Sequence, residues 1–532
     1  MMRSMRKAAV GLLVAAAVVM CPVIASADDQ VNGGGPSAQS DVCVEGQGRK
    51  TGSWGDASYD IESDGSGGCV VRVHGGTVMG QPSDAPWFTS YEKKNPLADH
   101  VTRIVFQDGI KAPSSMQQLF GGLESLRGID GLDKIDTSNV NNMSDLFADD
   151  PHLTDFSGLL HWDVSNVAYM DSMFGWDSAL ADLKPLAGWD VSNVKSMGSM
   201  FVWDSALADL GPLRGWDVSN VRDMYGMFGW DSALADLGPL RGWDVSNVMS
   251  MGSMFAGDSA LADLGPLRGW DVSNVRDMYG MFGWDSALAD LGPLRGWDVS
   301  NVRDMSTMFR YDEKLTDVNL SGWDVSNLVY MNEMFGQIDN LTNVNLSGWK
   351  GSFQCAEAMF LSSGRSSLTV DLSGWDTSGL ISSTMFPANL SVLRVGPLTR
   401  LYEGSFVSEP SDGGVAESAG YTGRWTSGDG SWVSSVDKGS DKAQLAAKTQ
   451  EAGFRGGTFV WQQYADVSFD KNAPQGVSVS GDPLSVHMVG PDAAALRFTV
   501  PNYAAKDYKL VGWNTRRTAP GTRILPGPPS LV

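Results

Sequence analysis

A tryptophan that is followed in most copies by Asp-Val-Ser-Asn recurs at a fixed spacing, and it limits the folds open to this chain. The spacing is 27 residues as far as residue 297 and 26 residues beyond it, through Trp162, Trp189, Trp216, Trp243, Trp270, Trp297, Trp323, Trp349 and Trp375. A period of this length is typical of architectures in which each unit buries its apolar edge against the next. Since 532 residues exceed one ordinary core, we predict a repeat solenoid of about eleven units over residues 101–398.

A single unit indicates what the repeat builds. In "KLTDVNLSGWDVSNLVYMNEMF", the opening Leu-x-x-Val-x-Leu at residues 315–320 is the strand half of a leucine-rich repeat. The apolar residues Leu328, Met331, Met334 and Phe335 are three and four residues apart, which predicts one face of a short helix. We therefore expect a solenoid of leucine-rich-repeat type, with a short strand and a short helix in each unit.

The two unit lengths differ in the predicted strand. The longer units read "LADLGPLRGWD" where a shorter one reads "LTDVNLSGWD". Because proline lacks a backbone N–H and glycine loosens a strand, we expect a bulge or bend there in the middle units. Residues 204–248 recur letter for letter at 258–302. This identity indicates recent duplication, so the recurrence of a residue is weak evidence for a special role.

The segments that flank the array differ from it in composition. Residues 1–27 combine a basic start, a short apolar stretch and Ala-Ser-Ala, which predicts a secretory signal peptide. Residues 28–41 are a polar linker, and residues 42–100 alternate in the manner of strands, as expected of a β-rich N-terminal cap. Residues 399–464 form a small aromatic and glycine-rich module, and residues 465–532 predict the strands of a second one.

Three cysteines follow the predicted signal peptide. Cys43 and Cys69 flank a short alternating segment, and in an exported protein they can close a disulfide worth about 3 kcal/mol. Two buried free thiols are the alternative interpretation of this pair. Cys355 stands where other units carry different residues, and we expect it to fill the core rather than act as a nucleophile.

Composition and motifs exclude several classes of function. The formal net charge is −23, which argues against nucleic acid or an anionic membrane as a partner. No stretch after the signal peptide is apolar enough to be a membrane helix. The five histidines are scattered, and nucleophile elbows, zinc-ligand clusters and phosphate loops are absent from the sequence. We therefore expect no enzymatic activity, no metal and no cofactor.

Two other repeat folds fit less well than the solenoid. A propeller built from Trp-Asp repeats needs a longer period and four strands per blade. A calcium-binding β-roll needs Gly-Gly-x-Gly-x-Asp nonapeptides, which the sequence lacks. Recurring aspartates such as Asp217 and Asp244 are more simply turn and cap residues beside Ser219 and Ser246.

Aromatic residues supply candidate partner-binding positions. One repeat position is interrupted by Gly257, continues at Tyr311, and otherwise holds Trp176, Trp203, Trp230 and Trp284. A column of this kind is either part of the core or an exposed ribbon that can hold a sugar ring or an extended peptide. Tyr225 and Tyr279 occupy a second position, which small and polar residues mark as solvent-facing. They are either partner contacts or tolerated duplicates of one original.

Charged residues also recur in columns. Four arginines, Arg214, Arg241, Arg268 and Arg295, are expected to be offset by Asp209, Asp236, Asp263 and Asp290. Taken alone, this pattern is typical of a solvated face.

The motifs "LSGWDVSNLVYMNEMF", "GWDVSNVRDMYGMF" and "IDTSNVNNMSDLF" closely resemble the BspA-type leucine-rich repeat of bacterial surface proteins. In the C-terminal module, "VSFDKNAPQG" with "YKLVGWNTRRTAPGTRILPG" is similar to the Listeria-Bacteroides (internalin B-type) repeat, a β-grasp-like module that here lacks its last strand. These resemblances imply a secreted or wall-associated protein of a Gram-positive bacterium with a role in adhesion. Residues 525–529 read Leu-Pro-Gly-Pro-Pro rather than the sortase motif Leu-Pro-x-Thr-Gly, so the sequence does not support covalent wall anchoring. Truncation of the sequence at its C-terminus is the alternative explanation.

The expected function is recognition rather than catalysis. We expect a non-enzymatic secreted or cell-surface protein that acts as an adhesin-like scaffold for host or neighbouring-cell proteins. The alternative is a glycan-binding or structural component of the cell envelope, in which the solenoid is a spacer. Extracellular proteins or glycans are the expected partners, and neither nucleic acid nor membrane insertion is expected.

Overall fold

A computed structural model of the chain describes residues 43–45, 48–77, 79–90, 94–351, 353–361, 363, 368–380, 384–387, 390–402, 405, 421–434, 441–468 and 485–490. The predicted signal peptide and linker lie outside the described residues. So do residues 469–484 and 491–532, which hold most of the predicted C-terminal module.

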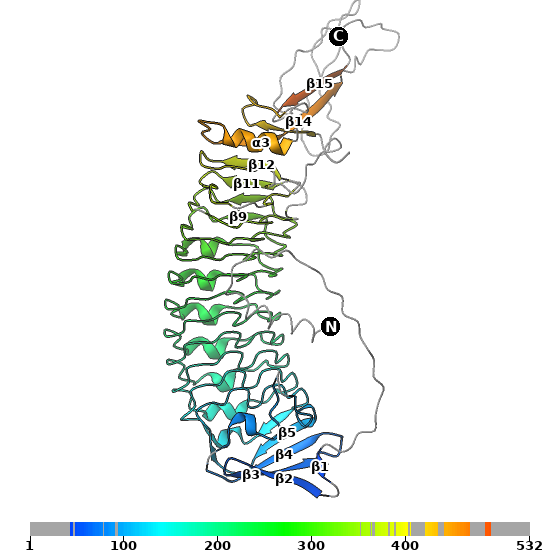
Figure 1. Ribbon diagram of the computed structural model, residues 1–532, viewed down its shortest axis with the longest axis vertical. Helices are drawn as coiled ribbons and strands as arrows, with labels where there is room; N and C mark the ends of the chain where they lie inside the picture. Colours follow the sequence, from blue (N-terminus) through cyan, green and yellow to red (C-terminus); the bar gives the residue numbers. More distant parts are fainter. Residues whose placement is uncertain are drawn as a thin grey trace, which may run out of the picture. The chain divides into compact units, whose positions relative to one another are not determined.

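The N-terminal region forms a sheet that leads directly into the repeats (Figure 1). Its strands, in spatial order, are β1 (Val44–Glu45), β2 (Gly48–Trp54), β3 (Ala57–Ser63), β4 (Cys69–His74), β5 (Val101–Phe106) and β7 (Gly128–Asp130). β1 to β4 pair antiparallel, whereas β4–β5 and β5–β7 pair parallel. Two short 3-10 helices, η1 (Pro82–Asp84) and η2 (Ala98–His100), precede β5. The sheet thus changes from hairpin pairing to the parallel pairing that stacked units require.

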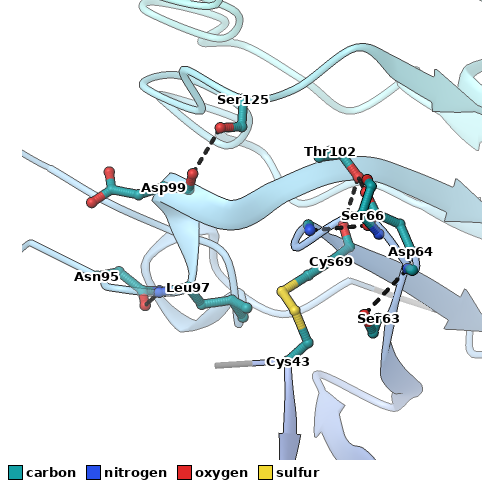
Figure 2. The surroundings of a disulfide bond; sticks show 12 residues. Cys43, Ser63, Asp64, Ser66, Cys69, Asn95, Leu97, Asp99, Thr102 and Ser125 are labelled. Carbon is teal, nitrogen blue, oxygen red and sulfur yellow. Dashed lines mark hydrogen bonds between the residues drawn. A yellow bond between two sulfur atoms is a disulfide. The ribbon is translucent and has the colours of Figure 1, made fainter. Parts of the chain in front are cut away.

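A disulfide joins the residue before β1 to the start of β4 (Figure 2). Cys43 and Cys69 are buried, and their Cα atoms are 5.5 Å apart. The β3–β4 turn beside them is closed by Asp64, whose Oδ1 accepts the N–H groups of Ser66 at 2.8 Å and Gly68 at 2.9 Å. Hydrogen bonds from Ser66 and Thr102 lower the pKa of Asp64 to about 2. Covalent and polar links together fix this edge of the cap.

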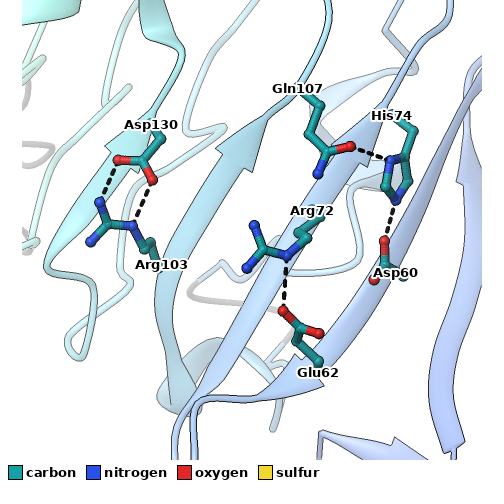
Figure 3. Close-up of polar contacts among 7 residues, drawn as sticks. All are labelled: Asp60, Glu62, Arg72, His74, Arg103, Gln107 and Asp130. Atoms are coloured by element: carbon teal, nitrogen blue, oxygen red, sulfur yellow. Dashed lines mark hydrogen bonds and ion pairs between the residues drawn. The ribbon is translucent and has the colours of Figure 1, made fainter.

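Charged side chains connect neighbouring strands across one face of the same sheet (Figure 3). His74 bonds through Nε2 to Asp60 and through Nδ1 to Gln107, the latter at 2.7 Å. The bond with Asp60 raises the pKa of His74. Two ion pairs lie beside this contact, Arg72 with Glu62 at 2.8 Å and Arg103 with Asp130 at 2.6 Å.

The Met-x-x-Met-Phe element of each unit forms a ladder with its neighbours rather than the helix that its spacing predicts. A single line of parallel bridges joins Ser115, Asn142, Tyr169, Ser196, Asp223, Ser250, Asp277, Asp304, Tyr330 and Cys355. In a typical unit the Met224 N–H donates to the Ser250 carbonyl at 3.0 Å, and the Gly226 N–H donates to the Gly252 carbonyl at 2.8 Å. A residue with positive φ follows two positions after the first methionine, so the element cannot continue as a right-handed helix.

The helical piece lies instead where the sequence predicts the strand. The proline-containing segments of the longer units form 3-10 helices: η5 (Lys184–Leu186), η6 (Gly211–Gly215), η7 (Gly238–Gly242), η8 (Gly265–Gly269) and η9 (Gly292–Gly296). η3 (Leu132–Lys134) and η4 (Ser157–His161) occupy the corresponding place in earlier units. The short strand β8 (Ile135–Asp136) directly follows η3 and pairs with β6 (Ile110–Lys111). Proline suits the first turn of a helix and interrupts a ladder, so the extra residue is absorbed by a turn rather than by a bulge.

The shorter units keep the predicted strand. β9 (Asp317–Asn319), β10 (Asn343–Asn345), β11 (Leu368–Leu372) and β12 (Leu390–Val395) pair in parallel, each with the next. Strands and ladder together confirm the predicted repeat solenoid of leucine-rich-repeat type.

Two columns of aromatic side chains form the centre of the repeats. The phenylalanines from Phe120 to Phe386 stack at intervals of 5.5–6.0 Å. The recurring tryptophans are buried, and each indole N–H donates to a leucine carbonyl of the preceding unit, as Trp243 does to Leu213 at 3.2 Å. The core is therefore continuous from unit to unit, and the indole N–H groups fix the register.

The last described segments extend the sheet of the shorter units. β14 (Gly457–Ser468) pairs antiparallel with β12, β13 (Tyr421–Ser427) and β15 (Ser485–Gly490). α3 (Asp441–Gln450) lies between β13 and β14 in the chain (Figure 1). β14 includes residues on both sides of position 464, where the sequence places the boundary between the two C-terminal modules.

Candidate functional site

The predicted aromatic positions lie at one turn of each unit, and they share an unusual backbone conformation. The φ angles are positive, 67°, 66°, 68°, 68° and 67°, at Trp176, Trp203, Trp230, Trp284 and Tyr311. A bulky residue adopts this left-handed conformation only when its surroundings hold it there. The ladder does so here, since the Trp230 N–H donates to the Ala256 carbonyl at 2.6 Å and the Trp284 N–H donates to the Arg310 carbonyl at 2.6 Å.

Four of these rings form a row that we call the aromatic ribbon: Trp203, Trp230, Trp284 and Tyr311. The Trp203 and Trp230 rings are parallel within 4° at a centroid distance of 4.7 Å. Trp230 and Trp284 follow at 5.8 Å with a tilt of 39°, and Trp284 and Tyr311 at 5.7 Å. Trp203 is 38% exposed, and the other three side chains are half-buried. The column is thus partly exposed, and it lies between the two arrangements that the sequence left open.

Gly257 does not break the ribbon. It holds the same turn position with φ +79°, and a Cβ atom there would lie 2.5 Å from the Trp230 ring. The missing side chain therefore leaves room for Trp230 to lie across this unit and contact Trp284, two units along.

A cation closes one end of the ribbon. The Arg310 guanidinium lies 4.9 Å from the centre of the Tyr311 ring and 5.8 Å from that of Trp284. It also pairs with Glu333 at 2.9 Å, and both of these side chains are about three-quarters buried. This arrangement holds a cation over the aromatic rings and fixes the ribbon's end.

The geometry of the ribbon determines which chemistry it can offer. Where neighbouring rings stack, as Trp203 and Trp230 do, the face that each ring turns toward its neighbour is covered. Such a surface presents apolar area with little conformational freedom, which suits burial against a partner. A sugar ring normally stacks on a free aromatic face, and the paired rings of Trp203 and Trp230 leave the least of it.

Trp176 and the two candidate tyrosines lie outside this row. Trp176 is half-buried, and its indole N–H is buried with no acceptor among the described residues. Tyr225 and Tyr279 are half-buried rather than fully solvent-facing. The Tyr225 ring lies over Gly252 of the next unit, where a Cβ would approach it to 2.8 Å, and burial raises the pKa of Tyr225.

The aspartates and the arginines of the two charged columns make different contacts. The exposed aspartates cap the 3-10 helices, as when Asp236 Oδ1 accepts the Gly238 N–H at 2.7 Å. The arginines of the column are exposed and form no ion pair with these aspartates within the described chain. The predicted charge compensation is thus absent as direct pairing, because the carboxylates bond to the backbone instead.

The remaining residues that the sequence analysis named contribute to turns and to the ladder. Asp217 and Asp244 accept the N–H groups of Ser219 at 3.0 Å and Ser246 at 3.1 Å, as turn residues do. Cys355 is half-buried and belongs to the ladder. Among the described residues, no group of three or more His, Cys, Asp or Glu side chains could hold a metal ion. No helix in the same part of the chain is long and apolar enough to cross a membrane.

Sequence reasoning missed a column of buried aspartates directly after the ribbon position: Asp150, Asp177, Asp204, Asp231, Asp258, Asp285 and Asp312. All seven are 0% exposed. Each Oδ1 accepts a backbone N–H of the preceding unit at 2.7–2.9 Å. The available signal was that an aspartate follows this turn position in all seven units, whether the position holds an aromatic residue, Gly257 or Asp149.

Comparison with known proteins gives a repeat family and a distant structure. No curated protein matches the chain. A crystal structure of a leucine-rich repeat protein from Bacteroides ovatus aligns with 11% identity and a TM-score of 0.25, over 59% of this chain and 93% of that one.

The family model described as "Mycoplasma protein of unknown function, DUF285" matches residues 114–236, 202–290 and 284–392. Together these matches extend from residue 114 to residue 392, which is more than half of the 532 residues. They cover the units that carry the ladder, the ribbon and the buried aspartates. The chain therefore belongs to the DUF285 family.

Proposed function

We propose that this chain is a non-enzymatic, secreted or cell-surface scaffold with an adhesin-like role, and that it holds host or neighbouring-cell proteins against the aromatic ribbon. The observation that carries the proposal is the ribbon itself. Its rings are kept at the surface by residues in a left-handed conformation, although the phenylalanine and tryptophan columns already fill the core. The same turn has a positive φ at Asp149 and Gln337, so the repeat sets the backbone, and the aromatic side chains are what distinguish the units of the ribbon.

The stacking within the ribbon favours a protein partner over a glycan. The exposed parts of these rings form an apolar strip that can be buried under a loop or strand of a partner. The disulfide between Cys43 and Cys69 supports an oxidising, extracellular location. The resemblance to BspA-type surface proteins supports the same assignment. Tyr225 and Tyr279, on the ladder of the same units, are proposed as secondary contacts.

Binding of the full chain to immobilised fibronectin, collagen and mucin tests the proposal. We expect a variant with Trp203→Ala and Trp230→Ala to bind at least about tenfold more weakly, as loss of central aromatic contacts usually causes. The matched control carries Arg214→Ala and Arg241→Ala, which alter exposed side chains of η6 and η7 rather than of the turn that holds the ribbon.

The outcomes separate the candidate functions. Loss of binding in the tryptophan variant alone supports recognition through the ribbon. Equal binding by both variants and the parent chain contradicts it. The second function, a glycan-binding component, is favoured if enzymatic removal of the mucin glycans abolishes binding while the tryptophan variant retains it. If no probe binds the parent chain, the spacer role is favoured.

A further inference from the structure

The column of seven buried aspartates has a feature that the proposed function does not use. In each carboxyl group, Oδ1 has a backbone partner, whereas Oδ2 is buried and has no hydrogen-bond partner among the described residues. Asp231 is typical: its Oδ1 accepts the Asp204 N–H at 2.8 Å, and its own N–H donates to Asp258 Oδ1 at 2.9 Å. Its carbonyl accepts the Leu234 N–H at 2.8 Å. One oxygen per group thus remains without compensation for its lost hydration.

The surroundings of the column are unfavourable for negative charge. The titratable groups that act on these carboxyls are the neighbouring members of the column and, at its first end, Asp149. No basic side chain acts on them within the described chain. Arg310, which directly precedes the last ribbon turn, is held by the Tyr311 and Trp284 rings and by Glu333. Seven stacked carboxylates would repel one another in a dry environment.

We propose that these seven side chains are uncharged carboxylic acids in the folded array. We propose also that they make the stability of the longer repeats pH-dependent, so that it is greatest at acidic pH and falls as the pH rises. A neutral acid still accepts the inter-unit N–H through Oδ1, and a proton on Oδ2 removes the buried charge. The column then links the units much as a column of side-chain amides would.

The direction of the pH dependence follows from linkage. Burial raises the pKa of every member well above its ordinary value of 3.8, so the folded chain binds more protons than the unfolded chain. The contribution of each acid is fully present below the unfolded pKa and is lost as the pH rises through the folded pKa. This dependence is opposite to acid denaturation, in which paired carboxylates lose their contribution as the pH falls.

Urea unfolding of the full chain between about pH 6 and about pH 9 tests the proposal, because ordinary carboxyls no longer titrate in this range. For each acid that is protonated only in the folded chain, the unfolding equilibrium constant rises by up to about tenfold with every unit of increase in pH. We expect Asp231→Asn to reduce that dependence by one such factor and to make the chain more resistant to urea at the upper end. Asp217→Asn is the matched control, since it makes the same substitution in an exposed turn, where hydrogen bonds from Ser219 lower the pKa of Asp217 and keep its carboxylate charged.

Infrared spectroscopy of the folded parent chain gives a second test, which does not depend on how well a variant folds. With isotope-labelled aspartate, the parent chain at about pH 7.5 should show the carbonyl band of protonated carboxylic acids, and Asp231→Asn should weaken it. Equal pH dependence in the parent chain, Asp231→Asn and Asp217→Asn overturns the proposal. So does the absence of the protonated-acid band in the folded parent chain.

Discussion

The longer and the shorter units share one core but differ at two surface segments of each unit, which we call corners: the segment before the recurring tryptophan and the turn that holds the ribbon position. In both, the phenylalanine column and the indole-to-leucine hydrogen bonds continue without interruption, as at Phe309, Phe335 and Phe360. At one corner, however, the longer units place a proline-containing 3-10 helix such as η8, whereas the shorter units place a strand such as β10. The period of the apolar residues thus fixes the stacking, and a single inserted residue changes the local structure only where it falls.

A second corner differs in the same way. The turn that holds an aromatic residue and a buried aspartate in the longer units holds Gln337 and Ile338 in a shorter one. The Ile338 N–H then donates to the hydroxyl of Ser363, which is neutral at every ordinary pH. Both the ribbon and the acid column therefore end where the shorter units begin. The corners, rather than the core, carry the features that could serve a partner or respond to pH.

The largest expected effect comes from the core and should be the same in both kinds of unit. Phe255 and Phe335 are fully buried, and each stacks between two neighbours of one column. Phe255→Ala and Phe335→Ala should each lower the free energy of unfolding by about 3 to 5 kcal/mol, because a cavity replaces a packed ring. Urea denaturation followed by circular dichroism measures the loss.

The leucine variants at the same two positions keep most of the volume and serve as controls. If Phe335→Ala lowers the free energy of unfolding by less than half as much as Phe255→Ala, the phenylalanine column contributes less to the stability of the shorter units, and the two kinds of unit do not share one core.

The sequence predicts the stacking well because it depends on the period alone. Every apolar letter that defines the period, from Leu207 and Trp216 to Met224 and Phe228, is buried as expected. The internal order of strand and helix could not be obtained in this way. The spacing of Met224, Met227 and Phe228 fits a helix and an inward-facing turn equally, and only the hydrogen bonds to the next unit distinguish them.

The candidate site was only partly predictable for a related reason. The aromatic position was identified from its recurrence, but its exposure depends on how Trp203 and Trp230 stack across units. The aspartate that follows was missed, because recurring aspartates such as Asp217 were interpreted as ordinary turn residues. In sequence the two kinds of aspartate look alike, and only the packing buries Asp231 while it leaves Asp217 exposed.

An intermediate effect is expected at the corner where helix and strand alternate. Asp263 Oδ1 caps η8 by accepting the Gly265 N–H at 2.7 Å, and Asn345 Oδ1 accepts the Ser347 N–H at 3.1 Å beside β10. Asp263→Ala should cost about 1 kcal/mol, since a backbone N–H loses its partner at a helix start. Asn345→Ala should cost less, because the pairing of β10 with both neighbouring strands remains.

Urea denaturation of the two alanine variants, with Asp263→Asn as the control that keeps the capping oxygen, measures the difference. A larger loss at Asn345 than at Asp263 would show that the strand corner, and not the helical one, depends on its cap.

The smallest effect is expected for the exposed charges of the longer units. Arg268 lies on η8, is exposed, and has no ion-pair partner within the described chain, so Arg268→Ala should change the free energy of unfolding by less than about 0.5 kcal/mol. Arg394 of β12 lies 4.0 Å from Asp371 on β11, and a partly exposed pair of this kind contributes between zero and about 1 kcal/mol. Arg394→Ala should therefore cost at least as much as Arg268→Ala, and the difference should shrink in high salt, where such pairs are screened. A clear loss of stability for Arg268→Ala at high salt would mean that its side chain packs on η8 through its apolar stem, and the corners of the longer units would then depend on more than their caps.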